Sequence, residues 1–72
     1  MYIDETIKID KEGLPLDLAN EIDLMDSLYA NKREALFYLK LNEIYAMAKT
    51  YMLSNYIDGI TCEKIWKRYG VA

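Results

Sequence analysis

The stretch of sequence that decides the fold is residues 32–54, KREALFYLKLNEIYAMAKTYMLS. Its apolar side chains recur at intervals of three and four residues, which places them on one side of an α-helix. This main stripe consists of Phe37, Leu41, Ile44, Ala48 and Tyr51, and it is widened by Tyr38, Tyr45 and Met52. The pattern predicts a long helix, from about Lys32 to Ser54, with this stripe in the core.

The same segment carries a second apolar stripe. Leu39, Ala46 and Leu53 recur every seven residues on nearly the opposite side of the predicted helix, among polar neighbours. Two explanations remain open. Either a third helix, an N-terminal arm or simple scattered exposure accounts for these side chains, or they form a second packing surface for self-association or for a partner helix. The three residues are therefore the candidate interface.

Residues 14–31 predict a shorter helix that pairs with the long one as an antiparallel hairpin. Pro15 suits the first turn of a helix, because its missing N–H leaves no hydrogen bond unmade. The helix is predicted to run to about Tyr29, and its inward side chains at helical spacing are Leu18, Ile22, Met25 and Tyr29. Asn31 is predicted to end this helix in a left-handed conformation and to cap the next one.

A third, short helix is predicted near the end of the chain. Residues 55–59 read as a loop with a glycine-containing turn, and Thr61 is predicted to be the N-cap. The helix should stop at Gly70, with an inward face formed by Cys62, Ile65, Trp66 and Tyr69. Its outward bases form a candidate basic patch, which consists of Lys64, Lys67 and Arg68.

The chain of 72 residues is long enough for one small core and too short for two domains. Residues 1–13 mix isolated apolar side chains with charges and predict an extended N-terminal arm. This arm can pack over the helices, fray, or pair with the arm of another copy, and the pattern does not choose among these. The predicted fold is all-α, a small three-helix domain over residues 14–72 that consists of a helical hairpin and a short third helix.

The formal net charge of −3 hides an asymmetry between the two halves of the chain. Residues 1–30 carry eight acids and two lysines, for −6, whereas residues 31–72 carry seven bases and four acids, for +3. The two halves can pack together with opposite charges around their contact, or one half can offer a charged face to a partner. Because the chain is acidic overall, it lacks the excess of cations that general nucleic-acid binding needs, so nucleic acid is an unlikely partner.

The composition offers little for catalysis. The chain has no histidine and one cysteine, Cys62, so it lacks the clustered ligands of a zinc site and the base that would activate a thiol. No glycine-rich phosphate loop is present. We therefore expect no enzyme activity, no metal, no cofactor and no small-molecule substrate. A single cysteine fits a cytoplasmic protein, and no apolar run approaches the roughly 18 residues of a membrane span.

Two resemblances add context. The segments Leu14 to Leu18 and Asp23 to Tyr29, together with the ending Arg68-Tyr69-Gly70, resemble a family of small uncharacterised helical proteins of Gram-positive gut bacteria, often near mobile elements. That resemblance implies no activity. Residues 53–67, with Gly59-Ile60-Thr61 and Glu63, are similar to the short C-terminal helical hairpin named SHOCT, which implies a role in oligomerisation.

The sequence thus favours a non-catalytic protein-interaction module, with self-association as one of its open uses. The alternative is a small nucleic-acid-associated regulator from a mobile element, which would use the third helix and its basic patch. A third hypothesis rests on charge alone. In it, the acidic residues of the first helix occupy the nucleic-acid channel of a partner; these residues are Asp17, Glu21, Asp23 and Asp26.

Overall fold

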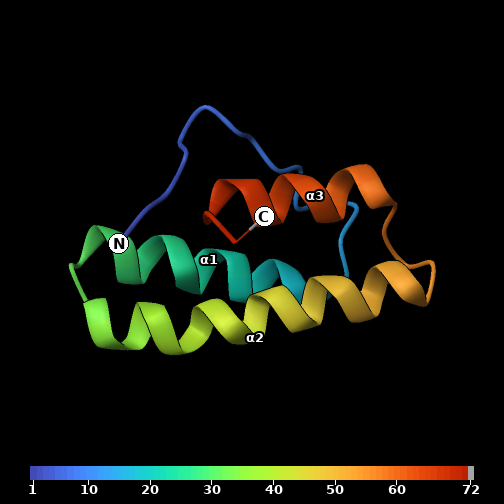
Figure 1. The fold of residues 1–72 in the computed structure, drawn as a ribbon. Helices are drawn as coiled ribbons and strands as arrows, with labels where there is room; N and C mark the ends of the chain where they lie inside the picture. The colour runs from blue at the N-terminus through green and yellow to red at the C-terminus, as the bar shows by residue number, and fades with distance from the viewer. Residues whose placement is uncertain (72) are drawn as a thin grey trace.

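The structure, a computed structural model, describes residues 1–71 and contains three α-helices. They are α1 (Leu16–Ala30), α2 (Glu34–Leu53) and α3 (Gly59–Arg68), and no strand occurs within the described residues. Consecutive helices run antiparallel, and α3 lies across the α1–α2 hairpin (Figure 1). The predicted all-α, three-helix class is confirmed.

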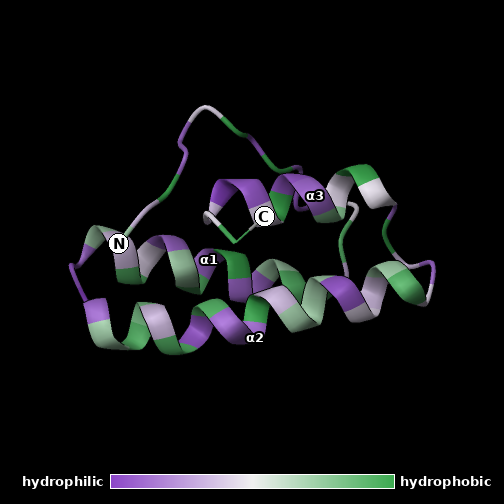
Figure 2. Cartoon of the chain, in the orientation of Figure 1, coloured by the Kyte–Doolittle hydropathy of each residue, from purple (hydrophilic) through white to green (hydrophobic). Residues whose placement is uncertain are grey.

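The core lies between the three helices and is built from the predicted apolar faces (Figure 2). No charged or polar residue among those described is buried in it. The buried side chains of the helices are Leu18, Ile22, Met25 and Leu28 of α1, Phe37, Ile44 and Ala48 of α2, and Cys62 and Ile65 of α3. The buried members of the predicted stripes therefore meet at the same interior, as the spacing predicts. Tyr38 and Tyr45, which were predicted to widen the core stripe of α2, are instead 47% and 37% exposed.

The turn between α1 and α2 differs from the prediction. Asn31 has a φ of −92°, and the left-handed residue is Lys32, with a φ of 56°. Asn31 instead donates its side-chain amide to the Ser27 carbonyl oxygen at 2.9 Å, which closes the last turn of α1. Because Asn31 is used at the end of α1, it does not cap α2, which begins after Arg33 without a side-chain cap.

The starts of the other two helices also differ from the prediction. Asp58, not Thr61, is the N-cap of α3, and its carboxylate accepts the Thr61 backbone N–H at 2.7 Å. Asp58 is the N-cap because its extended backbone directs the carboxylate toward the exposed N–H groups of the first turn. Hydrogen bonding from Thr61, through its side chain and then its backbone N–H, lowers the pKa of Asp58. Pro15 lies one position before α1 and not within its first turn.

The arm packs over the helices in the structure, which is one of the three possibilities that the sequence left open. Figure 1 shows residues 1–13 as an open arch above α3 that returns to the start of α1. Ile3 anchors the arm in the core and is 8% exposed. The Asp4 backbone N–H donates to the Arg68 carbonyl oxygen at 2.7 Å. The backbones of α1 and α3 are farther apart than those of the other helix pairs, and the arm lies beside the end of α3 in this part of the molecule.

Candidate functional site

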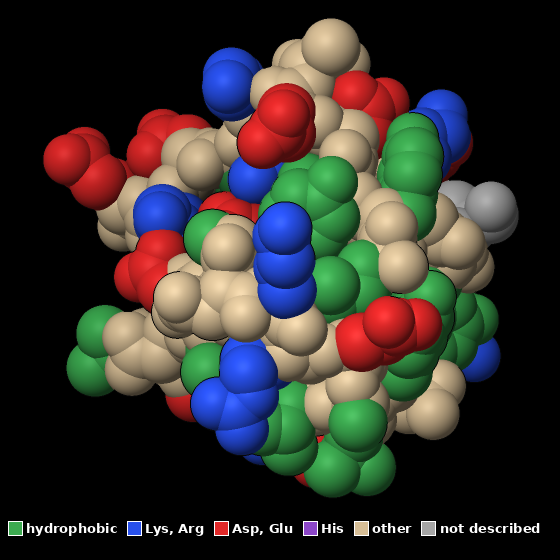
Figure 3. Space-filling view, turned by 90° about the vertical axis from the view of Figure 1, so that its left-hand side faces the viewer, with side chains coloured by type: hydrophobic (Ala, Val, Ile, Leu, Met, Phe, Trp, Pro, Cys, Tyr) green, Lys and Arg blue, Asp and Glu red, His purple; other side chains and the backbone are tan. Residues whose placement is uncertain are grey.

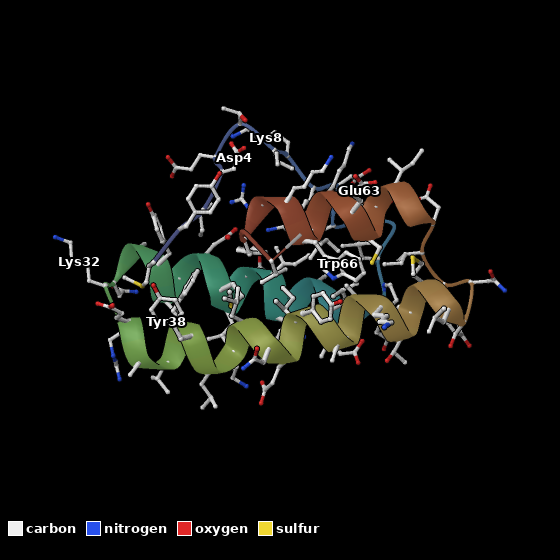
Figure 4. All side chains as sticks on the ribbon, in the orientation of Figure 1. Asp4, Lys8, Lys32, Tyr38, Glu63 and Trp66 are labelled. Atoms are coloured by element: carbon white, nitrogen blue, oxygen red, sulfur yellow. The ribbon has the colours of Figure 1, made fainter. Side chains whose placement is uncertain are left out.

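The candidate interface lies on the side of α2 that faces away from the core. Leu39 is 59% exposed and Leu53 is 68% exposed, and Ala46 between them is also exposed. We refer to these three residues as the outer face of α2. Figure 4 shows side chains of α2 that project away from the other two helices along the lower edge of the view. Neither α3 nor the arm covers the outer face.

The position of α3 explains why the outer face stays exposed. α2 packs against both other helices, and both lie on its core side. Trp66 of α3 stacks on Tyr45 with ring centroids 4.6 Å apart, and its indole N–H donates to the Tyr45 carbonyl oxygen at 3.3 Å. This contact holds α3 along one flank of α2. α3 is a straight helix of 10 residues, so it lies on one side of α2, which has 20 residues, and cannot also cover the opposite side.

Polar side chains border the outer face. They are Asn42, Glu43, Lys49 and Thr50, all exposed. Glu43 is already paired within α2, because the Lys40 ammonium lies 2.8 Å from its carboxylate. An exposed apolar centre with a polar border has the composition of a protein–protein contact surface.

The three members of the candidate basic patch do not lie together on one free surface. Arg68 turns inward, where its side chain is 14% exposed and its guanidinium lies 3.2 Å from the Asp26 carboxylate. The Lys67 ammonium pairs with Glu63 at 2.8 Å, and this pairing lowers the pKa of Glu63. Lys64 is the one member without an ion pair among residues 1–71. A nucleic-acid surface on α3 therefore lacks the guanidinium that the sequence assigned to it.

The acidic residues of α1 are engaged within the chain, starting with those that face α2. The Tyr51 hydroxyl donates to the Asp17 carboxylate at 2.5 Å, and this bond raises the pKa of Tyr51. The Glu21 carboxylate lies 3.8 Å from the Lys40 ammonium, and its side chain is largely covered. Both contacts join the acidic first half of the chain to the second half.

The other two acids contact the arm and the end of α3. Asp23 pairs with Lys11 of the arm. Asp26 accepts a hydrogen bond from the Tyr69 hydroxyl at 2.8 Å, beside its ion pair with Arg68. Burial and then this hydrogen bond raise the pKa of Tyr69. Opposite charges of the two halves of the chain thus meet where the halves pack together. This is the first of the two explanations given for the charge asymmetry between residues 1–30 and 31–72.

The cluster of Asp26, Arg68 and Tyr69 was not foreseen from the sequence. The inward position of Tyr69 followed from helical spacing, and Tyr69 is indeed buried. Arg68 was assigned to the outer surface because a cation near a helix C-terminus is favourable when solvated. The signal that could have found the cluster is the acid at position 26, which lies just outside the apolar stripe of α1 and so borders the core.

Other chemistry in the described residues is sparse. Cys62 is a free, buried thiol, and burial raises its pKa. No group of three or more potential metal ligands occurs within residues 1–71, and no helix there is long and apolar enough to cross a membrane.

The surface has shallow hollows and one apolar end. One hollow, of about 500 Å³, lies beside the α1–α2 turn and is lined by Met1, Tyr29, Ala30, Lys32 and Glu34. Figure 3 shows apolar side chains gathered across this end of the molecule between charged ones.

A scan against protein-family models gives no match, and neither does a search of the curated proteins or of the solved structures.

Proposed function

We propose that this chain is a non-catalytic interaction module that pairs with a second copy of itself through the outer face of α2. The observation that carries the proposal is the exposure of Leu39 and Leu53 on either side of the exposed Ala46. Apolar side chains that recur every seven residues pack well against a helix with the same repeat.

The outer face has the symmetry that pairing with itself requires. Leu39 and Leu53 are each seven residues from Ala46. If two copies of α2 cross antiparallel at Ala46, Leu39 of each copy packs against Leu53 of the other. The small Ala46 side chains at the crossing allow the two helices to approach closely. The apolar contact would extend over about 21 Å, since 14 residues rise 1.5 Å each.

The polar border supports the antiparallel direction. Helical geometry then brings Thr50 of one copy beside Glu43 of the other on one border. On the opposite border Lys49 comes beside Asn42. Each charged group meets a neutral polar group, and the two Glu43 carboxylates are separated along the helix axis and each keeps its Lys40 partner. No close contact between like charges opposes the pairing.

The pairing should be weak because the surface is small. Three apolar side chains per copy bury less than the roughly 800 Å² per partner of a standard interface. We therefore expect an equilibrium between monomer and dimer that shifts with concentration. Cytoplasmic residence remains part of the proposal, on the ground that the single cysteine forms no bridge within the chain.

The test is sedimentation velocity over a concentration series with the double variant Leu39→Glu/Leu53→Glu. Both side chains are exposed, so the variant should keep the wild-type helix content and melting temperature. Its dimer dissociation constant should rise about tenfold or more, because charges replace the apolar contact.

The matched control is Leu16→Glu/Ile60→Glu, which places the same charge at two apolar residues outside the outer face that are at least as exposed as Leu39 and Leu53. This control should dimerise like the wild type. A wild type that stays monomeric, or a control that dissociates as far as the test variant, would contradict the proposal. Unfolding of the test variant would also contradict it, since the stripe would then belong to the core.

A further inference from the structure

The outer face of α2 supplies one row of apolar side chains, and that row does not by itself select a direction of pairing. An antiparallel pair matches Leu39 of one copy with Leu53 of the other. A parallel pair would match each leucine with its own counterpart and would bury the same apolar side chains. The direction must therefore be decided by the residues on either side of the row.

Each side of the row carries one charged and one neutral side chain. Asn42 and Lys49 lie on one side, and Glu43 and Thr50 lie on the other, and all four are exposed. Lys49 makes no ion pair within residues 1–71, and Glu43 is paired with Lys40. Both sides of the row thus bring a charge to any contact between two copies.

A parallel pair would place like charges together. Two helices that pack along a seven-residue repeat meet through two rows, and the second row lies three or four residues beyond the first. In a parallel pair each residue of a row meets the same residue of the other copy. The second row then places Lys49 against Lys49 or Glu43 against Glu43, and either contact is repulsive.

The antiparallel pair avoids both contacts. Lys49 lies three residues beyond Ala46, so it is about 4.5 Å from the crossing along the helix axis, and its counterpart is the same distance on the other side. The two Lys49 side chains are therefore about 9 Å apart along the axis, and the two Glu43 side chains are separated in the same way. Each charge lies beside a neutral side chain instead.

We propose that Glu43 and Lys49 determine the direction in which two copies of this chain pair, because their charges exclude the parallel dimer. This inference rests on the pairing proposed above, and it adds the residues that select between two dimers with the same apolar contact area. The partner is then a second copy in one orientation only.

The test is disulfide trapping with a cysteine placed in the apolar row. ¹⁵N-labelled Leu39→Cys chains are mixed with unlabelled Leu53→Cys chains in a glutathione redox buffer, and intact masses show which positions are joined. Cys62 is buried, so the wild-type chain treated alike is the blank. The mixed dimer, which joins position 39 to position 53, should exceed the same-position dimers about tenfold.

The two ways to fail are distinct. Same-position dimers as abundant as the mixed dimer would overturn the inference while two copies still pair through this surface. The absence of every disulfide dimer would contradict the pairing itself, and the inference with it.

Variants of the flanking residues test which side chains select the direction. Glu43→Leu/Lys49→Leu removes both charges, so the share of same-position dimers should rise about fivefold or more. The matched control Asn42→Leu/Thr50→Leu adds two leucines at the same flanks and keeps both charges, so its mixed dimer should remain dominant. All four side chains are exposed, so both variants should keep the wild-type helix content. A charge variant that still pairs antiparallel, or a control that loses the direction equally, would overturn the inference.

Discussion

The charged side chains of α1 and the apolar side chains on the outer face of α2 differ in where they find their contacts. Asp17, Glu21 and Asp26 each contact a hydroxyl or a cation in α2 or in the last residues of the described chain. Leu39 and Leu53 remain exposed. The acidic side of α1, which the sequence offered as a charged face for a partner, is thus largely engaged within the molecule.

This difference changes which partner the surface favours. An acidic face that mimics nucleic acid needs solvated carboxylates with no counter-charge. In this chain Asp23 and Asp26 are each paired with a cation, and Asp17 accepts a hydroxyl hydrogen bond. The acidic surface of α1, as a mimic of nucleic acid, therefore loses most of its unpaired negative charge. The proposed partner surface is instead apolar, and it is the outer face of α2.

The largest contrast should come from two apolar residues on opposite sides of α2. Phe37 is 1% exposed and packs with Tyr29 at a ring-centroid distance of 6.1 Å. Phe37→Ala should lower the free energy of unfolding by about 3–5 kcal/mol, since it leaves a cavity in the core. Leu39→Ala should change it by about 0.5 kcal/mol or less. Urea titration followed by circular dichroism measures both, and equal losses would place Leu39 in the core.

A smaller effect is expected from the ion pair that joins α1 to the end of α3. Arg68→Met removes the partner of Asp26 and the two hydrogen bonds to the arm. The free energy of unfolding should fall by about 2–3 kcal/mol, because Asp26 is left without its cation in a partly covered position. The control Lys64→Met, on the same helix but without an ion pair, should lie within about 0.5 kcal/mol of the wild type. Equal effects of the two variants would show that the ion pair between Asp26 and Arg68 does not stabilise the fold.

The smallest stability effect concerns the hydroxyl beside this pair. Tyr69→Phe removes the hydrogen bond to Asp26, and the loss should be about 1 kcal/mol. The folded protein raises the pKa of Tyr69 above its ordinary 10.0, because burial and the bond to Asp26 disfavour the phenolate. This group's contribution is therefore fully present below pH 10 and is lost as the pH rises beyond it.

Unfolding of the wild type and of Tyr69→Phe measured at pH 8 and at pH 11 tests this sign. The wild type should lose more stability between the two values than the variant does. If the two proteins lose the same amount, the Tyr69 phenol does not titrate with folding.

Helical periodicity predicted the three helices and most of the core because it reports which side of a helix is apolar. Phe37, Ile44 and Ala48 are buried as that spacing requires. Periodicity also placed Leu39 and Leu53 on the opposite side, although it could not tell whether another element covers them. Whether another element covers these two side chains depends on where α3 packs. The stacking of Trp66 on Tyr45 fixes that position.

Two features lay beyond the sequence patterns for physical reasons. The N-cap of α3 was assigned to Thr61 although Asp58 fills that role, because both residue types suit a cap and only the backbone geometry separates them. The inward turn of Arg68 was missed since a long, flexible side chain at the border of a face can point either way. The seat of Ile3 has no periodic signal at all, because the arm is irregular.

In the dimer that we propose, the outer face of α2 is the surface through which this chain associates with itself. The most direct test is a dilution series of ¹⁵N-labelled wild-type protein followed by amide chemical shifts. We predict concentration-dependent shifts at Leu39, Ala46 and Leu53 and constant shifts at Asp23 and Asp26 of α1. Shifts that do not depend on concentration, or that change in α1 while the outer face stays constant, would contradict it.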